Sequence, residues 1–386
     1  MRFRSGNGDT IFLSYCSNVH PAEDVRGIMD QLGRYAARVR EQLGGPRLGV
    51  GLWIPAPAAS GLLRDRELLK RFKGSLERHS LEVVTLNGFP YRAFHAPAVK
   101  RNVYSPDWAD ALREEYTLNL ACLLAQIMPE DAAGGSISSV PLGWRQGWSP
   151  ERSARAREAL ERVARGLEEL SVRTGRAVRL ALEPEPGCEL ETVEATAAFL
   201  KDLDCRWIGV CLDACHLAVQ FEDPAASLAV LRDAGVPVVK AQLSSALRVP
   251  RPEAPEARDR LSGFSEPRFL HQVRERAAGE VLGVDDLCEA LQGALPGKGE
   301  WRVHFHVPIH RGGEETTQEE LLKLLCALVG GGMPGTTHLE VETYTWSVLP
   351  EGHRPRGEED LVKGIARELS WTRERLIGLG LEEVRS

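Results

Sequence analysis

Short apolar runs recur along the whole chain, and most of them end in a polar or acidic residue before a longer amphipathic segment begins. Runs of about four to eight residues are typical of buried strands, whereas the segments between them repeat apolar residues at helical spacing. The runs predicted as strands are 11–15, 48–54, 81–86, 178–182, 207–212, 236–243, 302–307 and 338–341. Strands that alternate with helices predict a parallel sheet covered by helices.

Eight such units without an internal repeat predict one (β/α)8 TIM barrel that occupies residues 1–386 as a single domain. An open, doubly wound sheet is the rival, but no GxGxxG motif follows any predicted strand. Two segments, at about 92–150 and 248–299, are longer than a crossover requires. We interpret both as loop insertions over the C-terminal face of the barrel, and the Gly-, Ser- and Pro-rich stretch 134–149 favours a loop there.

The net charge and the cysteine pattern indicate which partners and which cellular compartment to expect. The net charge of −7 opposes binding to phosphate backbones, so nucleic acid is not an expected partner. The eight cysteines form no CxxC pair, which is typical of reduced thiols in a cytoplasmic protein. Neither a signal-peptide pattern nor an apolar run of about 20 residues is present, so we expect no membrane span.

The ends of the predicted strands carry the candidate chemistry, because TIM-barrel sites lie at the C-terminal ends of strands. Glu183, Asp213 and Gln242 end predicted strands four, five and six, and Glu342 ends predicted strand eight. Residues one βα unit apart project from neighbouring strands towards a common point. Oxygen donors of this kind suit Mg²⁺ or Mn²⁺, and Zn²⁺ becomes a candidate if a histidine joins them.

Each of these residues also has an ordinary structural interpretation. In that interpretation the Glu183 side chain is simply solvated, and Glu185 is the alternative ligand. Asp213 then caps the helix that follows it. Gln242 is an uncommon metal ligand, so it would instead anchor a substrate. Glu340 shares strand parity with Glu342, but Glu342 lies nearer the C-terminal end and is the preferred candidate.

Histidines supply the candidate substrate-binding groups. The run 304–310 alternates histidines with apolar residues, which predicts that its imidazoles share one side of a strand, with His304 the most buried. A zinc cluster of Cys211, Cys215 and His216 is disfavoured, because no second Cys/His pair completes a tetrahedral set. The candidate substrate-binding residues are His216, His306, His310, His20 and Asn18.

Several stretches carry a family resemblance: Tyr15–Pro21, Ser136–Trp144, Glu183–Gly187, His304–Pro308 and Glu342–Trp346. Together with the Asp213-x-x-His216 element, they resemble the xylose isomerase-like family of TIM barrels and, within it, the EboE-like metabolite-traffic proteins. The resemblance implies that Glu183, Asp213, Gln242 and Glu342 hold one divalent ion (Mn, Mg or Zn). It also implies that Glu183 and Glu342 shuttle a proton and that His216 binds a substrate oxygen. Gln242 stands where many relatives carry histidine.

The expected function is a divalent-metal-dependent isomerase or epimerase that acts on a sugar, cyclitol or related polyol through an enediolate. The resemblance places this activity in secondary-metabolite biosynthesis or traffic. One alternative is a non-catalytic metabolite-binding or escort protein, whose two insertions would contact pathway proteins. The other is an endonuclease IV-like phosphodiester hydrolase, which the acidic charge and the small number of histidines disfavour.

Overall fold

Eight parallel strands close into a barrel in the computed structural model, which describes residues 1–384. Each barrel strand hydrogen-bonds to the next in chain order, and the last strand pairs with the first to close the ring. The strands are β2 (Thr10–Cys16), β3 (Leu48–Trp53), a third strand split into β4 (Leu81–Glu82) and β5 (Thr85–Asn87), β6 (Gly135–Ser139), β7 (Val178–Leu182), β8 (Ile208–Asp213), β9 (Val238–Leu243) and β14 (His338–Val341). The predicted TIM barrel is therefore confirmed.

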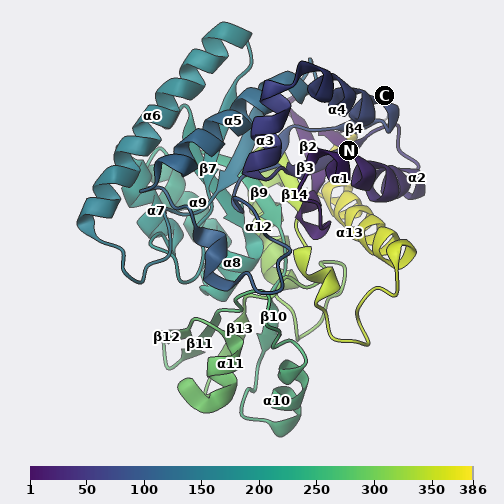
Figure 1. Cartoon of the computed structure of the whole chain (residues 1–386). Coiled ribbons are helices and arrows are strands. Elements are labelled where there is room, and N and C mark those ends of the chain that lie inside the picture. Colours follow the sequence, from purple (N-terminus) through teal and green to yellow (C-terminus); the bar gives the residue numbers. More distant parts are fainter. Residues whose placement is uncertain (385–386) are drawn as a thin grey trace.

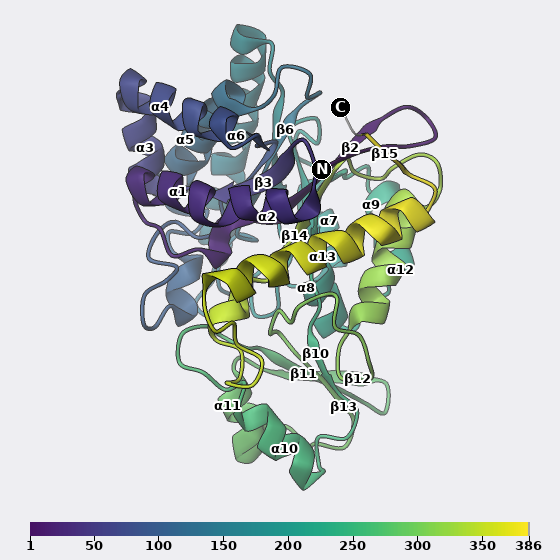
Figure 2. The same ribbon diagram turned by 90° about the vertical axis from the view of Figure 1, so that its right-hand side faces the viewer.

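Helices form the outside of the barrel, as Figures 1 and 2 show. They are α1 (Val25–Gln31), α2 (Ala37–Leu43), α3 (Ala56–Arg64), α4 (Arg66–Arg78), α5 (Ala111–Ile127), α6 (Pro150–Thr174), α7 (Val193–Leu200), α8 (Ala214–Val219), α9 (Pro224–Asp233), α12 (Gln318–Val329) and α13 (Glu358–Gly378). Asp and Ser side chains cap several N-termini; Asp24 accepts from the Gly27 amide and Ser149 from the Arg152 amide. Within residues 1–384, none of the helices is both long and apolar enough for a bilayer crossing.

A second, antiparallel sheet extends from the C-terminal end of β9 and forms the lobe below the barrel in Figures 1 and 2. Its strands are β10 (Leu247–Val249), β11 (Val273–Ala277), β12 (Glu280–Val284) and β13 (Glu300–Val303), with α10 (Pro255–Ser262) and α11 (Leu287–Glu289) between them. Short strands β1 (Arg2–Arg4) and β15 (Glu382–Glu383) pair antiparallel with each other beside β2.

Two of the strand predictions are wrong. Residues 302–307 were predicted as a barrel strand, but β13 pairs antiparallel with β10 and β11 and ends at Val303. The missing barrel strand is β6, which lies within the segment 134–149 that was predicted to be a loop. The β6 sequence GSISS has one large apolar residue, Ile137, so it lacks the apolar run by which the other strands were recognised.

The barrel interior contains a buried ion pair between Lys240 on β9 and Glu340 on β14. Both side chains are fully buried, and the Lys240 ammonium lies 3.4 Å from the Ser138 hydroxyl of β6. Gly51 on β3 leaves the space that the carboxylate needs, because a Cβ there would lie 1.3 Å from Glu340 Oε1. Polar residues thus fill the barrel one layer below the strand ends.

Candidate metal centre

Three carboxylates meet at the C-terminal ends of the barrel strands. Glu183 directly follows β7, Asp213 is the last residue of β8, and Glu342 directly follows β14. One oxygen from each carboxylate lies within 4.8 Å of the other two, and all three side chains are buried. This separation allows the three carboxylates to share one ion.

Gln242 on β9 belongs to the same ring of strand ends. It pairs in register with Asp213 on one side and with Glu340 on the other, and it is fully buried. Among residues 1–384, neither atom of its amide has a hydrogen-bond partner, and Glu183 Oε2 and Asp213 Oδ2 also have none. Leaving a buried polar group unpaired costs about 1–3 kcal/mol. The three oxygens among these atoms fit a bound cation, which would give each oxygen a partner.

Electrostatics favour the same interpretation. Burial and the nearby carboxylates of Glu342 and Asp213 raise the pKa of Glu183 well above its usual range. Burial, Asp213 and Glu340 raise the pKa of Glu342 to about 8, although Lys240 opposes this shift. Burial thus disfavours the ionised forms of Glu183 and Glu342, whereas a divalent cation would stabilise them.

Asparagines hold the Glu342 carboxylate in place. The side-chain amides of Asn18 and Asn87 donate to Glu342 Oε1 at 2.7 and 3.0 Å. Asn18 was predicted to bind substrate. Both Asn18 and Asn87 line the cavity, and both orient the Glu342 carboxylate. Asn87 was missed in the sequence analysis, although it ends the third strand as the other site residues end theirs.

Three histidines lie beside the carboxylates. His216 is in the first turn of α8, and His304 and His306 follow β13 in a segment without regular secondary structure. The prediction that the histidines of 304–310 lie along one side of a strand is therefore wrong. All three line the same cavity as Glu183 and Glu342, and His304, predicted as a packing residue, is a member of the site.

Two other histidines that were predicted to bind substrate, His20 and His310, lie outside this cavity. His20 stacks on Tyr35 at 4.3 Å between ring centroids, and its Nε2 lies 3.2 Å from the Tyr15 hydroxyl. It lines a separate small hollow with Tyr15 and Ile28. His310 stacks on Trp346 and is absent from the cavity wall.

The cavity above the carboxylates combines a polar floor with an apolar wall. It has about 530 Å³ of empty space, including its open mouth. Aromatic side chains form much of the wall: Phe89, Phe94, Tyr104, Phe269 and Tyr344. Apolar walls with a few convergent polar groups are typical of small-molecule sites.

Comparison with known proteins agrees with the barrel fold. The sequence profile described as a xylose isomerase-like TIM barrel matches residues 49–264, more than half of the chain. The chain belongs to the xylose isomerase-like family of TIM barrels. No curated protein sequence matches it.

Solved structures show the same fold across nearly the whole chain. A D-tagatose 3-epimerase-like protein has 15% identity and a TM-score of 0.53, with 96% of this chain and 98% of that chain covered. D-allulose 3-epimerase from Methylomonas sp. has 13% identity and a TM-score of 0.52, with 97% and 100% covered. D-psicose 3-epimerase from Clostridium cellulolyticum H10 has 14% identity and a TM-score of 0.51, with 95% and 99% covered. At these identities the likeness shows the fold alone.

The four predicted ligands lie on other strands of this xylose isomerase-like barrel than the sequence indicated. With β6 counted, Glu183, Asp213, Gln242 and Glu342 come from strands five, six, seven and eight, not from four, five, six and eight as predicted. Four neighbouring strands therefore supply the four residues, which explains how they converge on one side of the barrel mouth.

Glu368 on α13 positions two of the segments that carry site residues. Its Oε1 accepts from the Ile309 amide at 3.0 Å and the Thr343 hydroxyl at 2.7 Å, and its Oε2 accepts from Trp346 Nε1 at 3.2 Å. Thr343 follows Glu342, and Ile309 lies three residues after His306. Burial raises the pKa of Glu368 to about 7.

The substitution Glu368→Gln tests this positioning role. Glutamine has one carboxamide oxygen, so it cannot accept from both the Ile309 amide and the Trp346 indole, which approach different oxygens. We expect a loss of about 1–3 kcal/mol in the free energy of unfolding. We also expect about 10–100-fold weaker Mn²⁺ binding in calorimetry. Glu374→Gln, on an exposed position of the same helix, is the matched control and should change neither quantity. Unchanged Mn²⁺ affinity in Glu368→Gln would show that α13 does not position the site.

Proposed function

We propose that this protein is a divalent-metal-dependent isomerase or epimerase that acts on a sugar, cyclitol or related polyol. The observation that carries the proposal is the convergence of Glu183, Asp213 and Glu342 within 4.8 Å of one another in a buried position. Gln242, with its unpartnered amide, adds a fourth oxygen donor at the next strand end. The same fold in a D-allulose 3-epimerase and a D-psicose 3-epimerase supports the choice of substrate class.

Glu183 and Glu342 are the proposed acid/base groups as well as ligands. Both carboxyls have raised pKa values, and the pKa of Glu342, about 8, lies near neutral pH, where a general acid or base transfers protons most effectively. Asn18 and Asn87 orient the Glu342 carboxylate, which fixes the direction in which its other oxygen faces the cavity. Asp213 and Gln242 are proposed as ligands only. When bound, a divalent cation would stabilise the negative charge that develops on substrate oxygens as the proton beside the carbonyl leaves.

Within the family, we propose that the chain is EboE-like and acts in the biosynthesis or traffic of a secondary metabolite. The stretches Tyr15–Pro21 and Glu183–Gly187 border this site and support that assignment. The aromatic wall suits a substrate that presents a carbon-rich face as well as hydroxyl groups.

Solvent-proton exchange tests the proposal directly. The protein, loaded with Mn²⁺, is incubated in deuterated water with a panel of ketoses and keto-cyclitols, and deuterium beside the carbonyl is measured by NMR. We expect incorporation with the wild type, and rates lower by about 10²–10⁴-fold in Glu183→Gln and Glu342→Gln. Glu222→Gln is the matched control, because Glu222 is a half-buried carboxylate with a raised pKa that lies outside the cavity.

The other outcomes separate the alternatives. Tight calorimetric binding of a metabolite without any exchange would favour an escort protein. Hydrolysis of a simple phosphodiester without exchange on any ketose would favour the hydrolase. Exchange that survives in both Gln variants would refute the assigned roles.

A further inference from the structure

Glu185 is a buried carboxylate of the cavity that the proposed reaction does not use. It lines the cavity with Glu183 and Glu342, and it is only 5% exposed. The carboxylates that converge within 4.8 Å of one another are those of Glu183, Asp213 and Glu342. A divalent cation held by these three would therefore leave the charge of Glu185 to be compensated by another group.

The local sequence explains why two glutamates face the cavity from one short segment. Glu183 and Glu185 each precede a proline, and a proline restricts the residue before it to extended backbone. Side chains two positions apart in an extended segment point to the same side. The segment 183–187 therefore presents Glu185 on the same side as Glu183, two residues further from the end of β7.

Two donors hold one oxygen of the Glu185 carboxylate. The Tyr104 hydroxyl lies 2.6 Å from Glu185 Oε1, and Gln272 Nε2 lies 3.4 Å from the same atom. Gln272 Nε2 also donates to the Pro186 carbonyl at 2.8 Å and to the Tyr104 hydroxyl oxygen at 3.0 Å. Because the phenol oxygen accepts from Gln272, its own proton is donated to Glu185. Both donors reach Oε1, so Oε2 is the oxygen left to meet a ligand.

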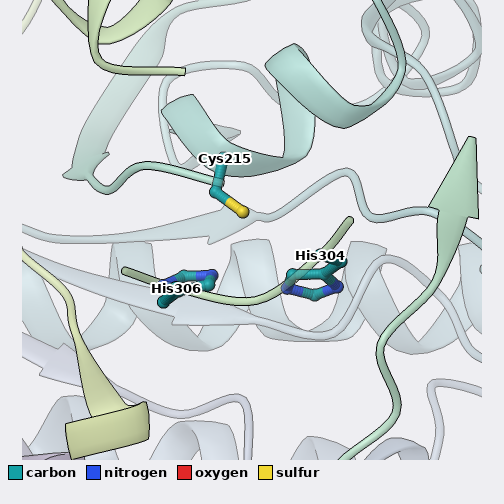
Figure 3. Close-up of side chains that lie close together, drawn as sticks. All are labelled: Cys215, His304 and His306. Atoms are coloured by element: carbon teal, nitrogen blue, oxygen red, sulfur yellow. The ribbon is translucent and has the colours of Figure 1, made fainter. Parts of the chain in front are cut away.

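The amide of Gln272 is fixed in turn by His304. Gln272 Oε1 lies 2.7 Å from His304 Nδ1, and Figure 3 shows His304 on the same short segment as His306. Gln272 is fully buried and directly precedes β11, so the inserted lobe reaches the barrel mouth through this residue. A carboxylate that is held in this way loses little conformational freedom when a ligand binds, and such preorganisation favours affinity.

The cavity offers Glu185 no free positive charge of a lysine or arginine. Among the residues that line it in the described part of the chain, Lys100 is the only lysine or arginine. The Lys100 ammonium lies 2.5 Å from Asp286 Oδ2, so its charge is already paired. A buried carboxylate without a cationic partner is destabilising. A substrate that carries an ammonium group would supply this partner, whereas a hydroxyl would supply a hydrogen bond without a charge.

Aromatic rings beside Glu185 favour the same kind of group. Phe89 and Tyr104 both line the cavity, with their ring centroids 5.9 Å apart. Trp144 supports Tyr104 from outside the cavity wall at 4.9 Å between ring centroids. The faces of aromatic rings attract ammonium groups, and more strongly where water is excluded. A carboxylate bordered by aromatic rings therefore suits an amine better than it suits a hydroxyl.

We propose that Glu185 is a specificity-determining residue that binds a protonated amino group of the substrate. The inference rests on the proposed function for the reacting end of the substrate, and it names the substrate class as an amino sugar or aminocyclitol. Glu183 and Glu342 act at the reacting carbon, while Glu185 Oε2 receives the amine at another position of the same molecule. Tyr104 is a positioning residue, because it fixes the other oxygen of the carboxylate.

Calorimetry with matched ligands tests this subsite. The Mn²⁺-loaded protein is titrated with D-fructose and 1-amino-1-deoxy-D-fructose, and with scyllo-inositol and scyllo-inosamine. The six positions of scyllo-inositol are equivalent, so the amine of scyllo-inosamine can reach the subsite in any orientation of the ring. We expect at least one amine to bind about 10–100-fold more tightly than its hydroxyl parent, the factor that a hydrogen bond to a charged group provides.

Variants then assign the preference to Glu185. Glu185→Gln keeps the size of the side chain but not its charge, so it should abolish the preference for the amine and leave Mn²⁺ affinity unchanged. Tyr104→Phe should reduce the preference without abolishing it. Glu189→Gln is the matched control, because Glu189 is a half-buried carboxylate of the same loop that lies outside the cavity. It should keep the full preference.

The opposite results would overturn the proposal. Equal affinity of the wild type for amine and hydroxyl in both pairs would do so, and this comparison needs no variant to fold. A preference that survives in Glu185→Gln would do so as well, and a loss of Mn²⁺ affinity in that variant would make Glu185 a metal ligand instead. A protein that prefers the amine but catalyses no deuterium exchange would support the subsite and count against the proposed reaction.

Discussion

Glu342→Gln is expected to stabilise the metal-free protein and, at the same time, to abolish its stabilisation by Mn²⁺. Glutamine keeps an oxygen that can accept from Asn18 and Asn87, so the local hydrogen bonds survive. It removes one of three buried carboxylates that repel one another when no cation is present. Binding to the folded state raises stability by mass action, and this gain disappears when the site loses a ligand.

The sign of the pH dependence follows from the raised pKa of Glu342. Folding raises this pKa from its ordinary 4.5 to about 8, so the folded state binds the proton more tightly than the unfolded state. The carboxylate therefore destabilises the metal-free fold progressively as the pH rises through that window. The gain from Glu342→Gln should be absent below about pH 4.5 and reach the order of a few kcal/mol above about pH 8.

Thermal unfolding across this pH range, with and without Mn²⁺, measures both effects. Glu222→Gln is the control, because burial raises the pKa of that carboxyl to about 7 but it lies away from the cavity. It should stabilise the metal-free protein in a similar way and retain the full rise in unfolding temperature with Mn²⁺. A Glu342→Gln variant that Mn²⁺ still stabilises like the wild type would exclude Glu342 as a ligand.

Lys240→Met should cause the largest loss of stability. The Lys240 ammonium is fully buried and forms an ion pair with Glu340, which raises the pKa of the lysine despite the opposing effect of burial. Methionine matches the aliphatic part of the side chain but leaves the Glu340 carboxylate buried and unpaired. Breaking a buried ion pair in this way costs about 3–5 kcal/mol.

Urea unfolding followed by circular dichroism gives the required free energies. The double variant Lys240→Met with Glu340→Leu removes both charges and should recover most of the loss, since apolar pairs often replace buried ion pairs without penalty. A loss of less than about 1 kcal/mol in the single variant would mean that water or another group compensates Glu340.

Much of the fold was predictable because most barrel strands are continuous apolar runs. The runs at 178–182 and 338–341 match β7 and β14 residue for residue. β6 was missed because its inward positions carry Ser136 and Ser138, which leave room for polar groups of the barrel interior such as Lys240 and His338. Residues 302–307 were mistaken for a barrel strand, because β13 is buried on both faces within the inserted sheet and therefore resembles one.

The carboxylates of the site were predictable, but the groups that orient them were only partly so. A strand end is visible in the sequence, so Glu183, Asp213 and Glu342 could be identified one by one. Glu368 acts through contacts more than 20 residues away in the chain, and no local pattern marks it. The sequence did not reveal that His20 and His310 lie outside the cavity, because adjacency to a site residue in sequence does not determine where a loop directs its side chain.

Anomalous scattering from a crystal of the Mn²⁺-loaded protein tests the central claim most directly. We predict a manganese peak at the ends of β7, β8, β9 and β14, in contact with Glu183, Asp213, Gln242 and Glu342. Absence of a peak there at saturating Mn²⁺, or a peak that contacts none of these four side chains, would contradict the account.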